Sequence, residues 1–318
     1  MHIKEPAIKE QKKIVIAGSG MMGHGIGQEF AAAGHIVTLL GRDETKIKQD
    51  IKKIERNLKE MIQWDLIDQH TSSTAMKNIR LTTSVNEAAR DADLVIEAII
   101  EDLDIKKQLF SKIDQACPEH TILASNTSTI LPSLLEDATK RPDKVAVTHY
   151  FNPPYLMPLV EIVRGSKTSD KTVDFLFNLL TSLGKDPIVC QKEAPGFIVN
   201  RLQMVLWREA FNIVQKGLAT PHDVDTAVKK SFGRRLGIAG PFEIYEHNDG
   251  YDLTLQCEEY MLDDMDTATK ESYPLLHEMV EKGHLGAKTG QGFYKWTPEF
   301  TASWRKAMLE NLVGYLKK

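Results

Sequence analysis

His149 and Glu161 are the residues whose types and spacing most suggest chemistry. They lie twelve residues apart in the stretch HYFNPPYLMPLVE, with three prolines between them. Glu161 falls inside the apolar run PLVEIV, where a carboxylate is costly to bury unless it is paired. A carboxylate beside an imidazole fixes its tautomer, which suits a group that exchanges a proton with a secondary alcohol. The alternative is a loop that leads into a strand, with His149 as a buried structural residue.

A glycine-rich turn, GSGMMG at 18–23, lies between the apolar run IVIAG and a helical segment. In this context the pattern G-x-G-x-x-G predicts a dinucleotide site, to which Met22 within the turn also belongs. Gly18 allows the tight turn, Gly20 lets the backbone approach a pyrophosphate, and Gly23 lets the helix pack close to the sheet. The N–H groups at the helix start then face the phosphates. The alternative is a turn that binds no ligand.

The end of the next apolar run, in VTLLGRDE, bears on the choice of dinucleotide. Gly41 stands where NAD sites normally carry an acidic residue for the ribose 2′-hydroxyl. A glycine leaves room for a 2′-phosphate, and Arg42 can pair with one, which favours NADP. Asp43 would reach the ribose only with a slightly different turn, and Arg42 is equally compatible with a solvent-facing loop. The expected cofactor is therefore NAD or NADP.

The elements that position these residues are short, β-branched apolar runs alternating with amphipathic segments. Such alternation predicts a parallel sheet covered by helices on both sides. The expected strands are 14–18, 36–40, 93–98, 121–126, 144–149 and a returning strand at 158–163. The expected helices between them include 46–62, 104–115 and 131–139. The charged stretch 46–70 is expected to form a helical pair beside the sheet or simply a solvated face.

Beyond about residue 190 the pattern changes to long helical runs without strand-like segments. The turn QKEAPG at 191–196 marks the change, so we expect a first domain at 1–192 and an all-α domain at 193–318. The expected helices of the second domain are 197–217, 221–231, a stretch in 251–265, 272–283 and 302–317.

Composition narrows the class of protein further. The 318 residues are 42% hydrophobic and 26% charged, with a formal net charge of -4, which gives no support to a nucleic-acid partner. No apolar run approaches the ~20 residues of a membrane span. The charged start MHIKEPAIKEQ lacks an apolar signal region. The three cysteines are far apart and fit neither a disulfide framework nor a metal site, so a reducing cytoplasm is expected.

Several motifs resemble those of the L-3-hydroxyacyl-CoA dehydrogenase family, in the family's order and over nearly the whole chain. They are GSGMMGHGIGQ, DLVIEAIIEDLDIKKQLF, ASNTST, HYFNPPYLMPLVE, APGFIVNRL, GPFE and LGAKTGQGFYKW. The resemblance implies an α/β Rossmann-type dinucleotide-binding domain followed by an all-α C-terminal domain that mediates homodimer formation. It also implies an oxidoreductase that interconverts 3-hydroxyacyl-CoA and 3-ketoacyl-CoA.

The resemblance also assigns site residues by position. His149 matches the catalytic base, Glu161 its carboxylate partner, and Ser128 the residue that binds the substrate oxygen. Asn200 matches an asparagine that holds the substrate. The positions expected to contact the dinucleotide are Ala98, Glu101, Lys106, Ser128, Asn152 and Lys288.

The substrate remains open between two kinds of molecule. NPPYLMPLVE and LWREA are similar to a branch containing L-gulonate 3-dehydrogenase, lambda-crystallin and carnitine dehydrogenase, whereas GPFE and GAKTGQGFYKW are typical of the acyl-CoA enzymes. A short-chain acyl-CoA is therefore expected, with a small free 3-hydroxy acid as the alternative. A structural or regulatory dinucleotide-binding protein is a third possibility, which the combined His149, Glu161, Ser128 and Asn200 set disfavours.

Overall fold

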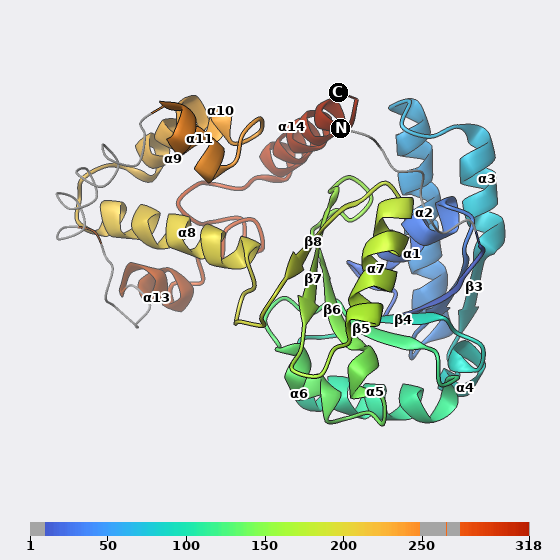
Figure 1. Cartoon of the computed structure of the whole chain (residues 1–318). Coiled ribbons are helices and arrows are strands. Elements are labelled where there is room, and N and C mark those ends of the chain that lie inside the picture. The colour runs from blue at the N-terminus through green and yellow to red at the C-terminus, as the bar shows by residue number, and fades with distance from the viewer. Residues whose placement is uncertain (1–9, 249–264, 266–273, 318) are drawn as a thin grey trace. The chain divides into compact units, whose positions relative to one another are not determined.

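The computed structural model describes residues 10–248, 265 and 274–317 (Figure 1). Within these residues no helix is long and apolar enough to cross a membrane. The helical stretch expected at 251–265 lies outside the described residues, apart from Met265, and so does Cys257.

The chain divides into two compact units. Unit 1 comprises Met1–Asn200 together with Leu309–Lys318, and unit 2 comprises Arg201–Met308. The final residues thus join the first unit, whereas the expected boundary placed them in the helical domain. The reason is apolar burial, because Val313 packs in a small core with Tyr155 and Leu156 of unit 1.

Unit 1 is built on one eight-stranded sheet in the order β3-β2-β1-β4-β5-β6-β7-β8. All neighbouring strands run parallel except β6 and β7, which are antiparallel. The strands are β1 (Lys13–Ala17), β2 (Ile36–Leu40), β3 (Ile79–Thr82), β4 (Leu94–Glu97), β5 (Ile122–Ser125), β6 (Val145–Tyr150), β7 (Leu159–Arg164) and β8 (Asp186–Cys190).

The six strands expected from the sequence are confirmed, and β3 and β8 were missed. These two are the edge strands of the sheet. An edge strand has one open side and keeps polar or turn-forming residues, such as Arg80 in β3 and Pro187 in β8. Neither strand therefore shows the continuous apolar run that identified the central strands.

Helices cover both faces of the sheet, as the alternating pattern predicted. On β1, Ile14 and Ile16 point into one core, and Val15 and Ala17 into the other, because successive side chains of a strand point to opposite faces. The first core is covered by α1 (Gly23–Ala32), α2 (Glu44–Gln63), α3 (Gln69–Asn78) and α7 (Asp170–Ser182). The second is covered by α4 (Val85–Ala89), α5 (Leu103–Ala116) and α6 (Pro132–Glu136).

The charged stretch 46–70, expected as a helical pair, contains most of α2 and only the start of α3, which continues to Asn78. Their starts are fixed by aspartates, since Asp43 accepts a hydrogen bond from the Thr45 N–H at 2.8 Å and Asp68 accepts one from the Thr71 N–H at 2.7 Å. On its inner face α2 buries Ile47, among other apolar residues, and it leaves most of its lysines exposed.

The described part of unit 2 is helical, with two isolated β-bridges at Gly286–Gln291 and Gln291–Lys295. Thr220 and Asp223 form a reciprocal capping box at the start of α9. The helices are α8 (Val199–Gln215), which begins in unit 1, α9 (Pro221–Lys230), α10 (Phe232–Arg235), α11 (Pro241–Asn248), α13 (Pro274–Glu281) and α14 (Pro298–Leu316), which ends in unit 1.

Candidate active site

The glycine-rich turn follows β1 and leads into α1. Gly18 has a φ of +105°, and a Cβ there would lie 2.6 Å from the Ala98 carbonyl oxygen. A Cβ on Gly23 would lie 1.7 Å from the Gly18 carbonyl oxygen, so only glycine lets the helix start this close to the turn. Gly20 faces open space, with nothing within 4 Å of an added Cβ.

The start of α1 fits a dinucleotide pyrophosphate. Its N-cap, Met22, makes no side-chain capping bond, and Met21 is exposed. Helix-terminal N–H groups beside an open glycine carry a partial positive charge, which is the arrangement that binds phosphate oxygens.

At the end of β2, the Ile47 side chain occupies the space that a side chain at position 41 would need. A Cβ there would meet Ile47 Cγ1 at 2.8 Å, so an acidic side chain would require Ile47 to move. The Asp43 carboxylate caps α2 rather than standing free, while Arg42 is exposed. In this conformation the turn carries an exposed cation and no free carboxylate at the Gly41 position.

His149 and Glu161 form a direct buried pair. They are opposite partners in the antiparallel β6–β7 ladder, so the proline-rich segment between them is a long connection that returns the chain to the same level of the sheet. The distance from His149 Nδ1 to Glu161 Oε2 is 2.7 Å, and the two residues are 4% and 0% exposed. The structure thus places the two side chains in direct contact at a buried position.

Glu161 is held from its other side as well. Its Oε1 accepts hydrogen bonds from the N–H groups of Ile198 and Val199, both at 2.9 Å, where α8 begins. A carboxylate is an acceptor, so the hydrogen between the pair sits on His149 Nδ1. His149 Nε2 is then left with a lone pair that can take a proton.

Ser128 lies at the open side of this imidazole. Its Oγ is 3.2 Å from His149 Nε2, and the residue is exposed. Asn200 donates a hydrogen bond from Nδ2 to the Ser128 carbonyl oxygen at 3.1 Å. The structure therefore brings together all four residues that the sequence assigned to catalysis, and all four belong to unit 1.

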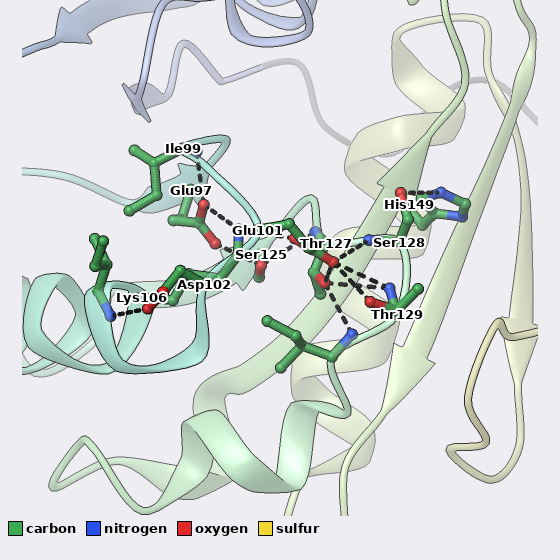
Figure 2. Close-up of polar contacts among 12 residues, drawn as sticks. Glu97, Ile99, Glu101, Asp102, Lys106, Ser125, Thr127, Ser128, Thr129 and His149 are labelled. Carbon is green, nitrogen blue, oxygen red and sulfur yellow. Dashed lines mark hydrogen bonds and ion pairs between the residues drawn. The ribbon is translucent and has the colours of Figure 1, made fainter. Parts of the chain in front are cut away.

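Glu101 fixes the segment that carries Ser128 (Figure 2). Its Oε1 accepts hydrogen bonds from the Ser128 N–H at 3.1 Å and the Thr129 N–H at 3.2 Å, and from the hydroxyls of Thr127 and Thr129. Burial tends to raise the pKa of Glu101, but the Thr127 and Thr129 side-chain hydrogen bonds, together with the charge and hydrogen bond of Lys106, outweigh it and lower the pKa.

Lys106 lies beneath this segment and is 1% exposed. Its Nζ is 2.6 Å from Glu97 Oε1 and 3.3 Å from Glu101 Oε2. Glu97 in turn accepts hydrogen bonds from Ser125 Oγ at 2.6 Å and from the Ile99 N–H at 2.7 Å (Figure 2). The Lys106 ammonium thus forms its ion pairs with two carboxylates of the protein, those of Glu97 and Glu101.

Two aromatic residues border the imidazole, and neither was predicted as a site residue. Phe151 meets His149 edge-on with ring centroids 4.6 Å apart, and Phe197 does so at 5.5 Å. Phe197 is buried and has a φ of +53°. Phe151 follows the β6 end and Phe197 belongs to APGFIVN, so only the fold shows that both flank the same ring.

The remaining expected dinucleotide contacts lie in different parts of the chain. Ala98 follows β4 beside Gly18, and Asn152 is exposed at the start of the loop after β6, before a cis Asn152–Pro153 bond. Lys288 is exposed on a turn of unit 2.

A glycine turn at the carboxyl end of β1, and a histidine near the carboxyl end of β6 that pairs with a glutamate on β7, are an arrangement typical of dinucleotide-dependent dehydrogenases. Residues 13–194 match the family model described as "3-hydroxyacyl-CoA dehydrogenase, NAD binding domain", and residues 196–296 match its C-terminal domain. The chain belongs to the 3-hydroxyacyl-CoA dehydrogenase family.

Individual relatives agree with this assignment. The chain is 37% identical over 296 residues to the mitochondrial hydroxyacyl-coenzyme A dehydrogenase of Sus scrofa, covering 90% of this chain and 91% of that protein. It is 36% identical over 284 residues to 3-hydroxybutyryl-CoA dehydrogenase of Clostridioides difficile, covering 89% and 99%. Among solved structures, an NAD⁺-dependent 5-formyl-3-hydroxy-2-methylpyridine-4-carboxylic acid 5-dehydrogenase superposes with a TM-score of 0.88 at 28% identity, covering 96% and 97%.

Proposed function

We propose that this protein is an NAD(P)-dependent dehydrogenase that interconverts short-chain L-3-hydroxyacyl-CoA and 3-ketoacyl-CoA. The observation that carries the proposal is the orientation of His149. Its Nδ1 is fixed on a buried carboxylate, and its Nε2 faces the exposed Ser128 hydroxyl. The relatives named for hydroxyacyl-CoA and 3-hydroxybutyryl-CoA support the substrate class.

In the oxidative direction, His149 Nε2 accepts the proton of the substrate C3 hydroxyl, and Glu161 keeps the ring in the required tautomer. The Ser128 hydroxyl hydrogen-bonds the same oxygen and fixes its place beside the imidazole. Asn200 holds the Ser128 backbone through its carbonyl and helps to place the acyl group. NAD, when bound, supplies the hydride acceptor for C3. In reverse, His149 returns the proton to the ketone oxygen.

Cofactor binding is proposed to use the open turn at Gly20 and the start of α1. The other residues of unit 1 proposed to line this site are Gly18, Met22, Gly23, Arg42, Ala98, Glu101 and Asn152. Lys106 is proposed to contribute through Glu101, because its own ammonium is buried. The NAD-binding family model favours NAD.

Acceptance of NADP is a separate proposal that rests on Gly41 and Arg42. If Arg42 pairs with a 2′-phosphate, Arg42→Ala will raise KM for NADPH about tenfold and leave KM for NADH within about twofold. Exchange of the neighbouring exposed Lys48 for Ala is the matched control. Equal effects of Arg42→Ala on both cofactors would show that Arg42 does not read the phosphate.

A second candidate is the same chemistry on a small free acid. It is favoured by the similarity to the pyridine carboxylic acid dehydrogenase, which extends over 96% of this chain. Steady-state assays with both cofactors separate the two candidate functions. They compare turnover of two thioesters, acetoacetyl-CoA and 3-hydroxybutyryl-CoA, with turnover of three free acids, carnitine, L-gulonate and 3-hydroxybutyrate. We expect kcat/KM to be highest for the thioesters. Preference for a free acid would select the second candidate, and cofactor binding without any oxidation would indicate a non-enzymatic protein.

A homodimer is proposed as well. In the single chain, α8 exposes several large apolar side chains to water, and a partner subunit would cover them. They are Leu202, Met204, Val205, Leu206 and Trp207. So many large apolar side chains exposed on one helix favour an interaction surface there. Light scattering coupled to size-exclusion chromatography is expected to give twice the chain mass of 35.8 kDa, and a monomeric mass would contradict the proposal.

A further inference from the structure

The connection between His149 and Glu161, residues 151–158, is tied to the rest of the unit by a buried lysine outside the site described above. Lys185 lies in the turn between α7 and β8 and is 6% exposed. Its Nζ donates hydrogen bonds to the carbonyl oxygens of Pro154 at 2.7 Å and Met157 at 2.9 Å. A single ammonium thus holds two points of this loop.

The third partner of Lys185 is Glu29 of α1, the helix that follows the glycine turn. The loop also packs directly on this helix, since a Cβ on Gly25 would lie 3.1 Å from the Pro154 ring. Lys185 therefore links the helix expected to bind the dinucleotide with the loop that joins His149 to Glu161 and presents Asn152.

The surroundings of the ion pair show how tightly it is enclosed. Glu29 Oε2 and the hydroxyl of Tyr150, the residue after His149, are both buried without a hydrogen-bond partner. Burial raises the pKa of Glu29 to about 7 despite the neighbouring Lys185 charge. A buried ion pair is by itself weak evidence for stabilisation, so the feature that distinguishes Lys185 is its pair of hydrogen bonds to the loop carbonyls.

We propose that Lys185 is a positioning residue, which holds the 151–158 loop against α1 so that the catalytic pair and Asn152 keep their place relative to the dinucleotide. This inference rests on the proposed dehydrogenase function. A displacement of about 1 Å at a reacting centre costs up to about a hundredfold in rate, so loss of this link is expected to lower kcat.

The experiment compares Lys185→Met with the double variant Lys185→Met/Glu29→Gln. The single variant leaves Glu29 buried without its cation and is expected to lower Tm. The double variant removes both charges and is expected to recover most of Tm, yet the carbonyls of Pro154 and Met157 still lack their donor. Lys171→Met, which removes an exposed ammonium from α7, is the matched control.

In the double variant we expect kcat to fall about tenfold to a hundredfold while the Kd for NADH stays within about twofold. Amide hydrogen exchange of the 151–158 peptide is expected to be faster than in the wild type, and exchange of the β1 peptide unchanged. A double variant with wild-type Tm, kcat and loop exchange would overturn the proposal, because Lys185 would then serve only to neutralise Glu29. The exchange readout needs no substrate, so it tests Lys185 even if the wild-type enzyme turns over none of the thioesters.

Discussion

Two buried clusters of ionisable side chains lie on the sheet, one at the carboxyl end of β4 and the other across β6 and β7, and they differ in whether an atom is left to contact an exposed residue. In the cluster after β4, Glu97 accepts bonds from Lys106, Ile99 and Ser125, so its oxygens are used inside the protein. In the cluster on β6 and β7, Glu161 is equally occupied, but His149 Nε2 is directed to an exposed hydroxyl. The first cluster is closed, whereas the second has one ring nitrogen that contacts the side chain of an exposed residue.

This difference separates a scaffold from a site that can perform chemistry. Buried ionisable residues alone do not mark catalysis, because structural pairs are buried too. An imidazole with one nitrogen held by a carboxylate and the other beside the hydroxyl of an exposed residue combines a defined tautomer with access to a substrate. The closed cluster is connected to the open one through Glu101, which accepts hydrogen bonds from the 127–129 segment that carries Ser128.

The largest expected effect on turnover comes from removing the open nitrogen. His149→Gln is expected to lower kcat about 10²–10⁴-fold, because no other described group contacts Ser128 Oγ as a base. Stopped-flow or steady-state absorbance at the NADH band measures the rate, and fluorescence titration is expected to show unchanged NADH binding. Full turnover in this variant would remove His149 from the mechanism.

Glu161→Gln is expected to lower kcat by about a hundredfold, through the tautomer. The N–H groups of Ile198 and Val199 require an acceptor, so the amide oxygen will face them and the amide NH₂ will face His149 Nδ1. The imidazole must then accept at Nδ1 and carry its hydrogen on Nε2, where it is no longer a base. NMR of labelled histidine reports this tautomer directly. An Nδ1–H tautomer with normal kcat would refute the reasoning.

Glu101→Gln is expected to reduce kcat/KM by about tenfold or less, because an amide keeps one acceptor for the 127–129 segment but faces Lys106 with its NH₂ group.

The pKa of Glu101 is lowered from 4.5, so its contribution to stability is present above pH 4.5 and is lost as the pH falls through the lower, folded-state pKa. The difference in free energy of unfolding between wild type and variant should therefore shrink in acid. A constant difference from pH 7 down to about pH 3 would contradict this assignment.

Lys106→Met is expected to affect turnover least and stability most. It leaves Glu97 buried without its cation, which costs about 3–5 kcal/mol in the free energy of unfolding. The kcat of the folded variant, measured well below its Tm, is expected to fall less than that of Glu101→Gln, because Lys106 acts on the 127–129 segment only through Glu101. Adding Glu97→Gln is expected to recover much of the stability. A large loss of kcat with unchanged Tm would mean that the Lys106 cluster is not closed.

Much of unit 1 followed from sequence patterns, and the exceptions have physical causes. Central strands buried on both faces require continuous apolar runs, which is why β1, β2, β4, β5, β6 and β7 were predicted. The edge strands β3 and β8 lack that requirement and were missed. The aromatic neighbours of His149, Phe151 and Phe197, were also missed, since they lie far apart in sequence and meet only through the fold.

The sequence by itself determined the glycine turn, the sheet-and-helix order and the identity of the candidate acid–base residues, because glycine sterics, hydrophobic periodicity and side-chain chemistry are local properties. Only the tertiary structure decided how these residues are used. The antiparallel β6–β7 ladder sets His149 opposite Glu161, burial closes Lys106 inside the protein, and Lys185 fastens the loop between the pair to α1. Such partnerships depend on long-range register and on exclusion of water, and no local pattern encodes either one.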